Sequence, residues 1–122
     1  MSVDETMGTR NVASFREECY TETIFNAGLL KKAIFDGRGS PEMQLMNFYS
    51  SFYQLWQITR GVMIVKNRMT KRADNGLDEK IKTWFDTKIV AGDRVEQARA
   101  ISLQGIEYAE EWLKMISDAG VL

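Results

Sequence analysis

The residues of this sequence best suited to metal chemistry are pairs of glutamates. Glu18 and Glu22 are four residues apart, as are Glu107 and Glu111, so each pair shares one face of a helix. Facing helices hold cations in this way in di-iron bundles and in magnesium-dependent pyrophosphohydrolases. The di-iron pattern needs Glu-x-x-His, and the chain has no histidine. The pyrophosphohydrolase pattern needs a second motif after Glu107-x-x-Glu110, and none follows. A carboxylate-metal hydrolase is therefore a remote alternative, and solvated helix faces are the preferred interpretation.

The absence of histidine also excludes the common nucleophilic arrangements. Neither a Ser-His-Asp triad nor a Cys-His pair can form within the chain. The single cysteine, Cys19, cannot form an intramolecular disulfide or complete a zinc site, and its setting beside Glu18 on an apolar face indicates packing. We therefore predict no catalytic, cofactor-binding or metal-ligating residue, and we expect a protein that is not an enzyme.

A group of cations suggests a different partner. No Asp or Glu occurs from Met43 to Ala73, whereas five Lys and Arg residues do. At about 100° per residue, four of these cations lie within about a third of a turn, and Tyr53 shares their side of the helix. Such a face could contact phosphates, or the acidic segment after residue 93 could neutralise it. Contact with nucleic acid or another anionic partner is thus the alternative prediction for Tyr53, Arg60, Arg68, Lys71 and Arg72.

The elements that position these residues are predicted to be helices. Helical periodicity and helix-stop signals indicate four helices, at roughly 12–35, 41–74, 78–91 and 94–118. Ser40 and Asp93 have the character of N-caps, and Gly76 that of a left-handed helix stop. No run alternates with period two. The expected fold is an all-α, antiparallel bundle with a long second helix as its spine.

The apolar residues predict which helix faces enter the core. The second helix has the clearest stripe, which includes Phe48, Phe52 and Leu55, whereas Tyr49 falls at the stripe's edge, where it could serve a protein interface. The third helix offers Ile81, Trp84, Phe85 and Ile89. The first helix has a less regular pattern, for which we expect a face of Phe15, Cys19, Ile24, Leu29, Ile34 and Phe35.

The fourth helix carries a strip of small residues. Ala98, Ser102, Gly105 and Ala109 follow steps of four, three and four, so they line one side of the helix. A glycine inside a helix costs about 1 kcal/mol relative to alanine, and close approach of another helix would offset this cost. The strip predicts either an intramolecular contact with the second helix, which is favoured, or a protein interface through which the chain associates with itself.

Length and composition support one domain without a named cofactor. The 122 residues are 44% hydrophobic and 27% charged, typical of one globular core, so we expect a single domain over 1–122 with 1–11 flexible. No signal-peptide pattern or membrane-spanning run is present, which predicts a cytoplasmic protein. Since no chemistry stands out, the leading functional hypothesis is a non-catalytic interaction protein, either a small homo-oligomer or an accessory subunit. Its partner would be protein, with nucleic acid as the alternative.

Overall fold

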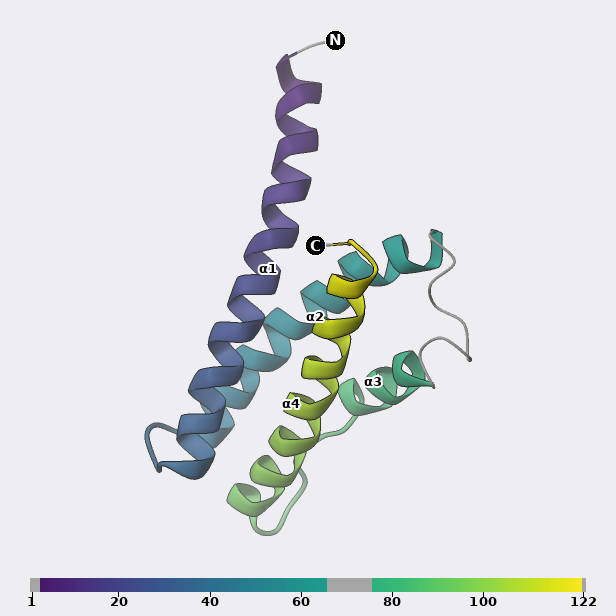
Figure 1. The fold of residues 1–122 in the computed structure, drawn as a ribbon. Coiled ribbons are helices and arrows are strands. Elements are labelled where there is room, and N and C mark those ends of the chain that lie inside the picture. The colour runs from purple at the N-terminus through teal and green to yellow at the C-terminus, as the bar shows by residue number, and fades with distance from the viewer. Residues whose placement is uncertain (1–2, 66–75, 122) are drawn as a thin grey trace.

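The part of the chain that the structure describes folds into a bundle of four helices, whose arrangement is shown in Figure 1. A computed structural model describes residues 3–65 and 76–121, with side chains from Ser14 onward. Helix α1 spans Val3–Phe35, α2 spans Pro41–Val65, α3 spans Leu77–Phe85 and α4 spans Arg94–Asp118. These described parts contain no strand. The predicted all-α class and helical bundle are therefore confirmed.

The two predicted N-caps, Ser40 and Asp93, both bind a backbone N–H of the helix that follows them. The hydroxyl oxygen of Ser40 accepts from the backbone N–H of Met43 at 3.3 Å, and Asp93 accepts from the N–H of Glu96 at 3.0 Å. Each cap therefore satisfies a donor that the first helical turn leaves without a backbone partner. Gly76 takes the left-handed conformation with φ of 76°. The left-handed conformation is as predicted, but Gly76 lies at the N-cap of α3, and the end of the preceding helix that it was expected to mark lies outside the described residues.

Two helix bounds differ from the prediction. The backbone of α1 is already helical at Val3, so part of the segment expected to be flexible, 1–11, has helical backbone. Helix α3 ends at Phe85 instead of continuing to 91. Beyond it, the side chain of Gln97 binds the backbone N–H and carbonyl of Val90 at 2.8 and 3.0 Å. The amide of Gln97 thus satisfies the N–H and carbonyl groups of Val90 that helical neighbours would otherwise bind, and the connection does not require helical hydrogen bonds. The predicted continuation of the second helix over 66–74 lies outside the described residues.

Helices α1 and α2 form an antiparallel hairpin, and α4 packs on both of them (Figure 1). The shorter α3 packs against α4, and the N-terminal part of α1 extends past the end of the bundle. Phe48, Phe52 and Leu55 are fully buried, which confirms the predicted stripe of the second helix. None of the described helices combines the length and the apolar composition needed to cross a bilayer.

Each of the three tryptophans donates its indole N–H to a partner from another part of the fold. Trp112 of α4 donates to the hydroxyl of Thr59 in α2 at 2.9 Å. Trp84 of α3 donates to the carbonyl of Ile101 in α4 at 2.8 Å, and Trp56 of α2 donates to Asp78 at 3.0 Å. Because a buried N–H without a partner is costly, these bonds fix how α2, α3 and α4 are placed relative to one another.

The face of α1 that enters the core is not the predicted one. Its buried residues are small or of medium size, namely Cys19, Thr23, Ala27, Leu30 and Ala33. Of the predicted face, Cys19 is buried as expected, but Phe15, Ile24 and Phe35 are exposed, and Leu29 and Ile34 are half-buried. The prediction was wrong because the large apolar residues of α1 are spread around the helix, and only the regular spacing of the smaller ones matches α2. Several large apolar side chains of α1 consequently lie on the surface.

Candidate interaction surface

The outward side of α2 carries no charged side chain. Of the 25 residues in this helix, only Glu42 and Arg60 are charged. Glu42 is ion-paired with Arg94 of α4 at 3.2 Å, and Arg60 is ion-paired with Asp78 of α3 at 2.9 Å. We use the term outer face of α2 for the uncharged residues of this helix that point away from the core: Met43, Met46, Asn47, Tyr49, Ser50, Tyr53, Gln57, Gly61 and Ile64.

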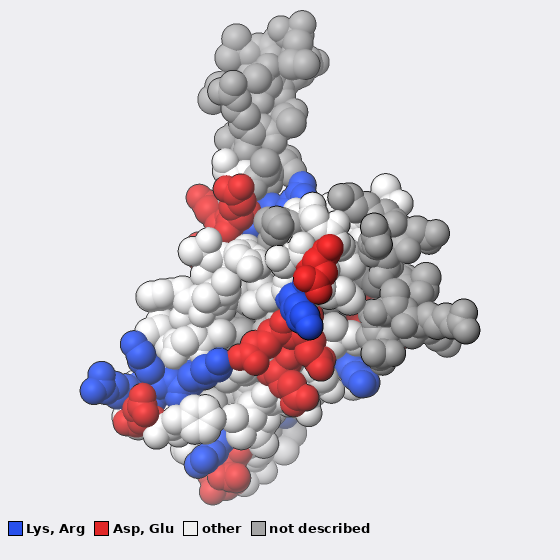
Figure 2. Space-filling view, viewed as in Figure 1, with Lys and Arg blue, Asp and Glu red and all other residues white. Residues whose placement is uncertain are grey.

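The outer face of α2 is largely apolar. Met46 is 73% exposed, Met43 is 62% exposed and Ile64 is 52% exposed. From Met43 to Ile64 the face is about 31 Å long at 1.5 Å per residue. Its polar members are amides and hydroxyls, which can hydrogen-bond to another protein without bringing a net charge. Figure 2 shows a contrasting side of the molecule, where charged side chains gather over α4.

Arg60 is held by α3 instead of pointing freely into solvent. Its Nε donates to both carboxylate oxygens of Asp78, at 2.9 and 3.0 Å. The carboxylate is buried, and it also accepts from the indole of Trp56. The guanidinium carbon of Arg60 lies 5.3 Å from the centroid of the Trp56 ring, within cation–π distance. The hydrogen bond with Asp78 raises the pKa of Arg60 above its ordinary value.

An aromatic cluster lines the α3 side of the outer face. Tyr49 donates its hydroxyl to the carbonyl of Phe85 at 2.9 Å, and its ring lies parallel to that of Tyr53. Both tyrosines meet Phe85 edge-on, and Gln57 donates to the hydroxyl of Tyr53 at 3.0 Å. Burial raises the pKa of Tyr49, with Tyr53 and Asp86 adding to the effect. The rings are therefore held rigidly while 37% of Tyr49 and 40% of Tyr53 stay exposed.

The structure brings together only part of the predicted anion-binding set. Tyr53 and Arg60 both belong to α2, and Arg60 is engaged by Asp78. Arg68, Lys71 and Arg72 lie outside the described residues. The acidic neighbour of Arg60 is on α3, whereas the neutralising partner considered from the sequence was the fourth helix. Contact with nucleic acid stays a prediction, and Arg60 is no longer a free cation for it.

The small-residue strip of α4 is buried inside the chain. Ala98, Ser102 and Ala109 are at most 1% exposed, and a Cβ on Gly105 would lie 2.2 Å from Trp84. At Gly105 the strip accommodates the indole ring of Trp84 from α3, and the burial of the whole strip fits the intramolecular alternative. A protein interface through Ala98, Ser102, Gly105 and Ala109 does not fit this fold, because these residues do not reach the surface. The partner also differs from the expected aromatics of the second helix.

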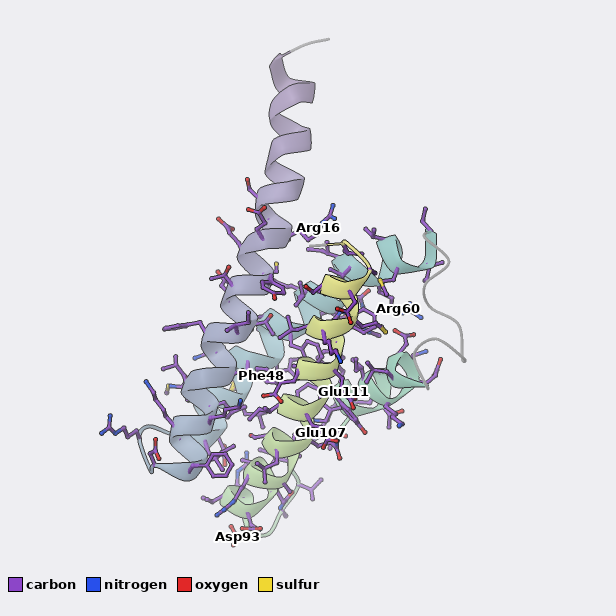
Figure 3. All side chains as sticks on the ribbon, in the orientation of Figure 1. Arg16, Phe48, Arg60, Asp93, Glu107 and Glu111 are labelled. Atoms are coloured by element: carbon purple, nitrogen blue, oxygen red, sulfur yellow. The ribbon has the colours of Figure 1, made fainter. Side chains whose placement is uncertain are left out.

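The carboxylate pairs lie on helix surfaces. Glu107 and Glu111 are exposed on one side of α4 (Figure 3), and Glu110 is ion-paired with Lys31 of α1 at 2.7 Å. Among the described residues, no group of three acidic or cysteine side chains is placed to hold a metal ion. Cys19 of α1 is buried, with its thiol 3.8 Å from the Gln54 side-chain oxygen of α2. Burial raises the pKa of the thiol, with Glu22 and Glu18 adding to the effect.

The outer face of α2 is the candidate site that sequence reasoning missed, apart from Tyr49 and Tyr53. Its signal was present in the sequence: the same absence of Asp and Glu after Met43 was interpreted as a basic face. Only the ion pairs of Glu42 and Arg60 show that the exposed part of α2 is uncharged. Comparison of the chain with family models, with curated proteins and with solved structures gives no match.

Proposed function

We propose that this chain is a non-catalytic assembly protein that works as a small homo-oligomer or as an accessory subunit of a larger complex. The observation that carries the proposal is the uncharged outer face of α2, with its exposed methionines and tyrosines. Solvent-facing sides of amphipathic helices are normally rich in charge. A long face without charge leaves apolar area in water unless a partner covers it.

The chemistry of this face favours a protein partner. Binding to phosphates needs exposed cations, and the cation of α2, Arg60, is paired with Asp78. Methionine side chains adapt to an apolar surface, and tyrosines add both contact area and a hydroxyl. The parallel rings of Tyr49 and Tyr53 are already fixed by Phe85 and Gln57, so little conformational entropy is lost when a partner packs against them.

Methionine oxidation tests this proposal. Dilute peroxide converts exposed thioethers to sulfoxides, and mass spectrometry reports the rate at each methionine. Met46 should react quickly in dilute purified protein, because it is 73% exposed. We expect at least a fivefold slower reaction of Met46 in concentrated protein or in the cells from which the chain comes.

The control is Met63, which has no exposed area in the isolated chain and should react slowly under every condition. Replacing Met46 and Tyr53 with glutamate should abolish the protection of Met43 on the same face. Equal oxidation of Met46 in dilute protein, in concentrated protein and in the source cells would contradict an assembly function of this face.

A further inference from the structure

Helix α1 carries a second surface, on the side away from α2 and α4. Asn26 donates to Ser51 of α2 at 3.2 Å, and Lys31 is bonded to Glu110 of α4 at 2.7 Å. These contacts mark the two sides of α1 that face the bundle. The remaining side carries a strip with steps of three and four, which we call the outer strip of α1: Glu18, Thr21, Phe25, Gly28 and Lys32.

The centre of the outer strip combines a protruding ring with an open space. Phe25 is 64% exposed, although it lies in the middle of the part of α1 that packs on the bundle. Gly28 lies one turn further along, and a Cβ there would meet no atom within 4 Å. Thr21, one turn before Phe25, is also small. A ring of another helix could therefore lie against the backbone of α1 at Gly28.

Charge is segregated along α1. Glu17, Glu18 and Glu22 precede the centre, Lys31 and Lys32 follow it, and the residues 23–30 between them are uncharged. Arg16, beside the acidic group, donates to the carbonyl of Val121, and Lys31 is paired with Glu110. The charges on the outer strip itself are therefore those of Glu18 and Lys32. In Figure 2 the charged atoms of this side gather at the upper part of α1, where red atoms have blue neighbours, and at its lower end, which is mainly blue, with uncharged atoms between. A helix with this order is complementary to itself when a copy runs in the opposite direction. A parallel copy would place like charges together.

We propose that two copies of this chain pair through the outer strips of α1, with the two helices antiparallel and the twofold axis level with Phe25 and Gly28. The Phe25 ring of each copy packs on Gly28 of the other, and the acidic segment of each lies along the basic segment of the other. Such a twofold contact uses the same patch on both subunits. The inference rests on the assembly function proposed above and names one partner for it, but it uses a surface other than the outer face of α2.

One helix pair forms a small interface, so the dimer should exchange with the monomer as concentration changes. Sedimentation equilibrium of the full chain should show a mass that rises from the 14.0 kDa monomer toward twice that value. High salt should weaken the association, because the paired charges are at the surface. A mass that stays monomeric up to millimolar concentration would overturn the proposal.

Charge exchange tests the antiparallel orientation. In this register the Lys32 of one copy is level with Thr21 of the other, so Glu18 lies within one helical turn of it. Glu18→Lys therefore brings like charges together and should raise the dissociation constant at least tenfold. The double variant Glu18→Lys with Lys32→Glu restores opposite charges and should return the constant to within about threefold of the wild-type value. Since both residues are exposed, the fold should be unaffected, and circular dichroism checks this. A double variant that associates as poorly as the single one contradicts the antiparallel arrangement.

The central contact has a matched control. Phe25→Lys should abolish dimer formation, whereas Val95→Lys on α4 should leave it unchanged, although Val95 has the same 64% exposure. If the chain associates equally well with Phe25→Lys, the outer strip is not the interface and this inference fails. In that case protection of Met46 would still support the assembly function. Conversely, a Phe25-dependent dimer with unprotected Met46 supports only the inference made here.

Discussion

Two glycines in the middle of long helices meet opposite surroundings. Gly105 of α4 lies under the indole of Trp84, and an added Cβ would come within 2.2 Å of the ring. Gly28 of α1 faces open space, and a Cβ added there would have no atom within 4 Å. Both helices have small residues at helical spacing. At Gly105 the space is filled by a tryptophan of the same chain, whereas at Gly28 it is open.

The comparison shows how a small-residue strip should be interpreted. In α4 the cost of a mid-helix glycine is offset inside the chain, since Trp84 fills the space and donates to Ile101. In α1 no side chain of the described residues fills the space at Gly28, so nothing in the monomer explains the glycine. This difference is why the proposed self-association is placed on α1, although the sequence alone directed it to α4.

The largest effect is expected for Gly105→Ala. The new methyl group would overlap a rigid, buried ring, and overpacking of this kind costs up to about 3 kcal/mol or more. The better helix propensity of alanine offsets only about 1 kcal/mol. We expect the free energy of unfolding to fall by about 2 to 3 kcal/mol, measured by urea denaturation.

A double variant sharpens this prediction. Trp84→Phe removes part of the ring that Gly105 accommodates, so Gly105→Ala should cost at least about 1 kcal/mol less in that background. Additive effects of the two substitutions would mean that the glycine is not required by the tryptophan, and the contrast between α4 and α1 would lose its basis.

The next largest effect is expected for Asp78→Ala, which tests whether the α3 side of α2 depends on internal partners. The substitution leaves the indole N–H of Trp56 and the guanidinium of Arg60 without their acceptor. The buried indole N–H of Trp56 loses its partner at a cost of about 1 to 3 kcal/mol, whereas water can reach Arg60, whose side chain is 35% exposed. The free energy of unfolding should therefore fall by about 2 kcal/mol. The neighbouring exposed Glu79→Ala is the matched control and should change it by less than about 0.5 kcal/mol.

Gly28→Ala should have a smaller effect of opposite sign. Because the site is open, alanine adds helix propensity without a clash, and the free energy of unfolding of the dilute monomer should rise by about 0.5 to 1 kcal/mol. Gly61→Ala, at another helical glycine with open space, should give a similar gain. A loss of stability at Gly28 in dilute protein would show that α1 is covered from within the chain.

The smallest effect is expected for the ion pair between Lys31 and Glu110. Both side chains are about half exposed, and exposed pairs contribute less than about 1 kcal/mol. A double-mutant cycle with alanine should give a coupling energy of about 0.5 kcal/mol or less. A coupling above about 1.5 kcal/mol would mean that this link between α1 and α4 is structural, and that the side of α1 facing α4 is set by charge instead of packing.

Local signals in the sequence predicted the helix starts correctly where a single side chain determines the conformation of the helix end. The caps at Ser40 and Asp93 and the left-handed Gly76 depend only on neighbours within one turn. Prediction failed where distant residues compete. Helix α3 ends at Phe85, and in the connection that follows, Gln97 of the next helix binds the backbone of Val90. No local pattern predicts that bond.

The candidate surface required the tertiary structure. Tyr49 and Tyr53 were placed at an edge from periodicity alone, and both are indeed partly exposed. Arg60, by contrast, was assigned to a cationic face, because a helical wheel contains no information about Asp78 of another helix. The charge of a surface is a sum over elements, so it cannot be derived from one helix.

By itself, the sequence determined the helical class, the helix starts and the apolar stripe of α2, because capping and periodicity are short-range and repeat along the chain. It also set the segregation of charge along α1. Only the tertiary structure decided which small-residue strip is filled, which face of α1 is buried and which cations are paired. Those outcomes depend on the shape and charge of segments that are distant in the sequence. The Trp84 ring packs at Gly105, and the space at Gly28 stays open.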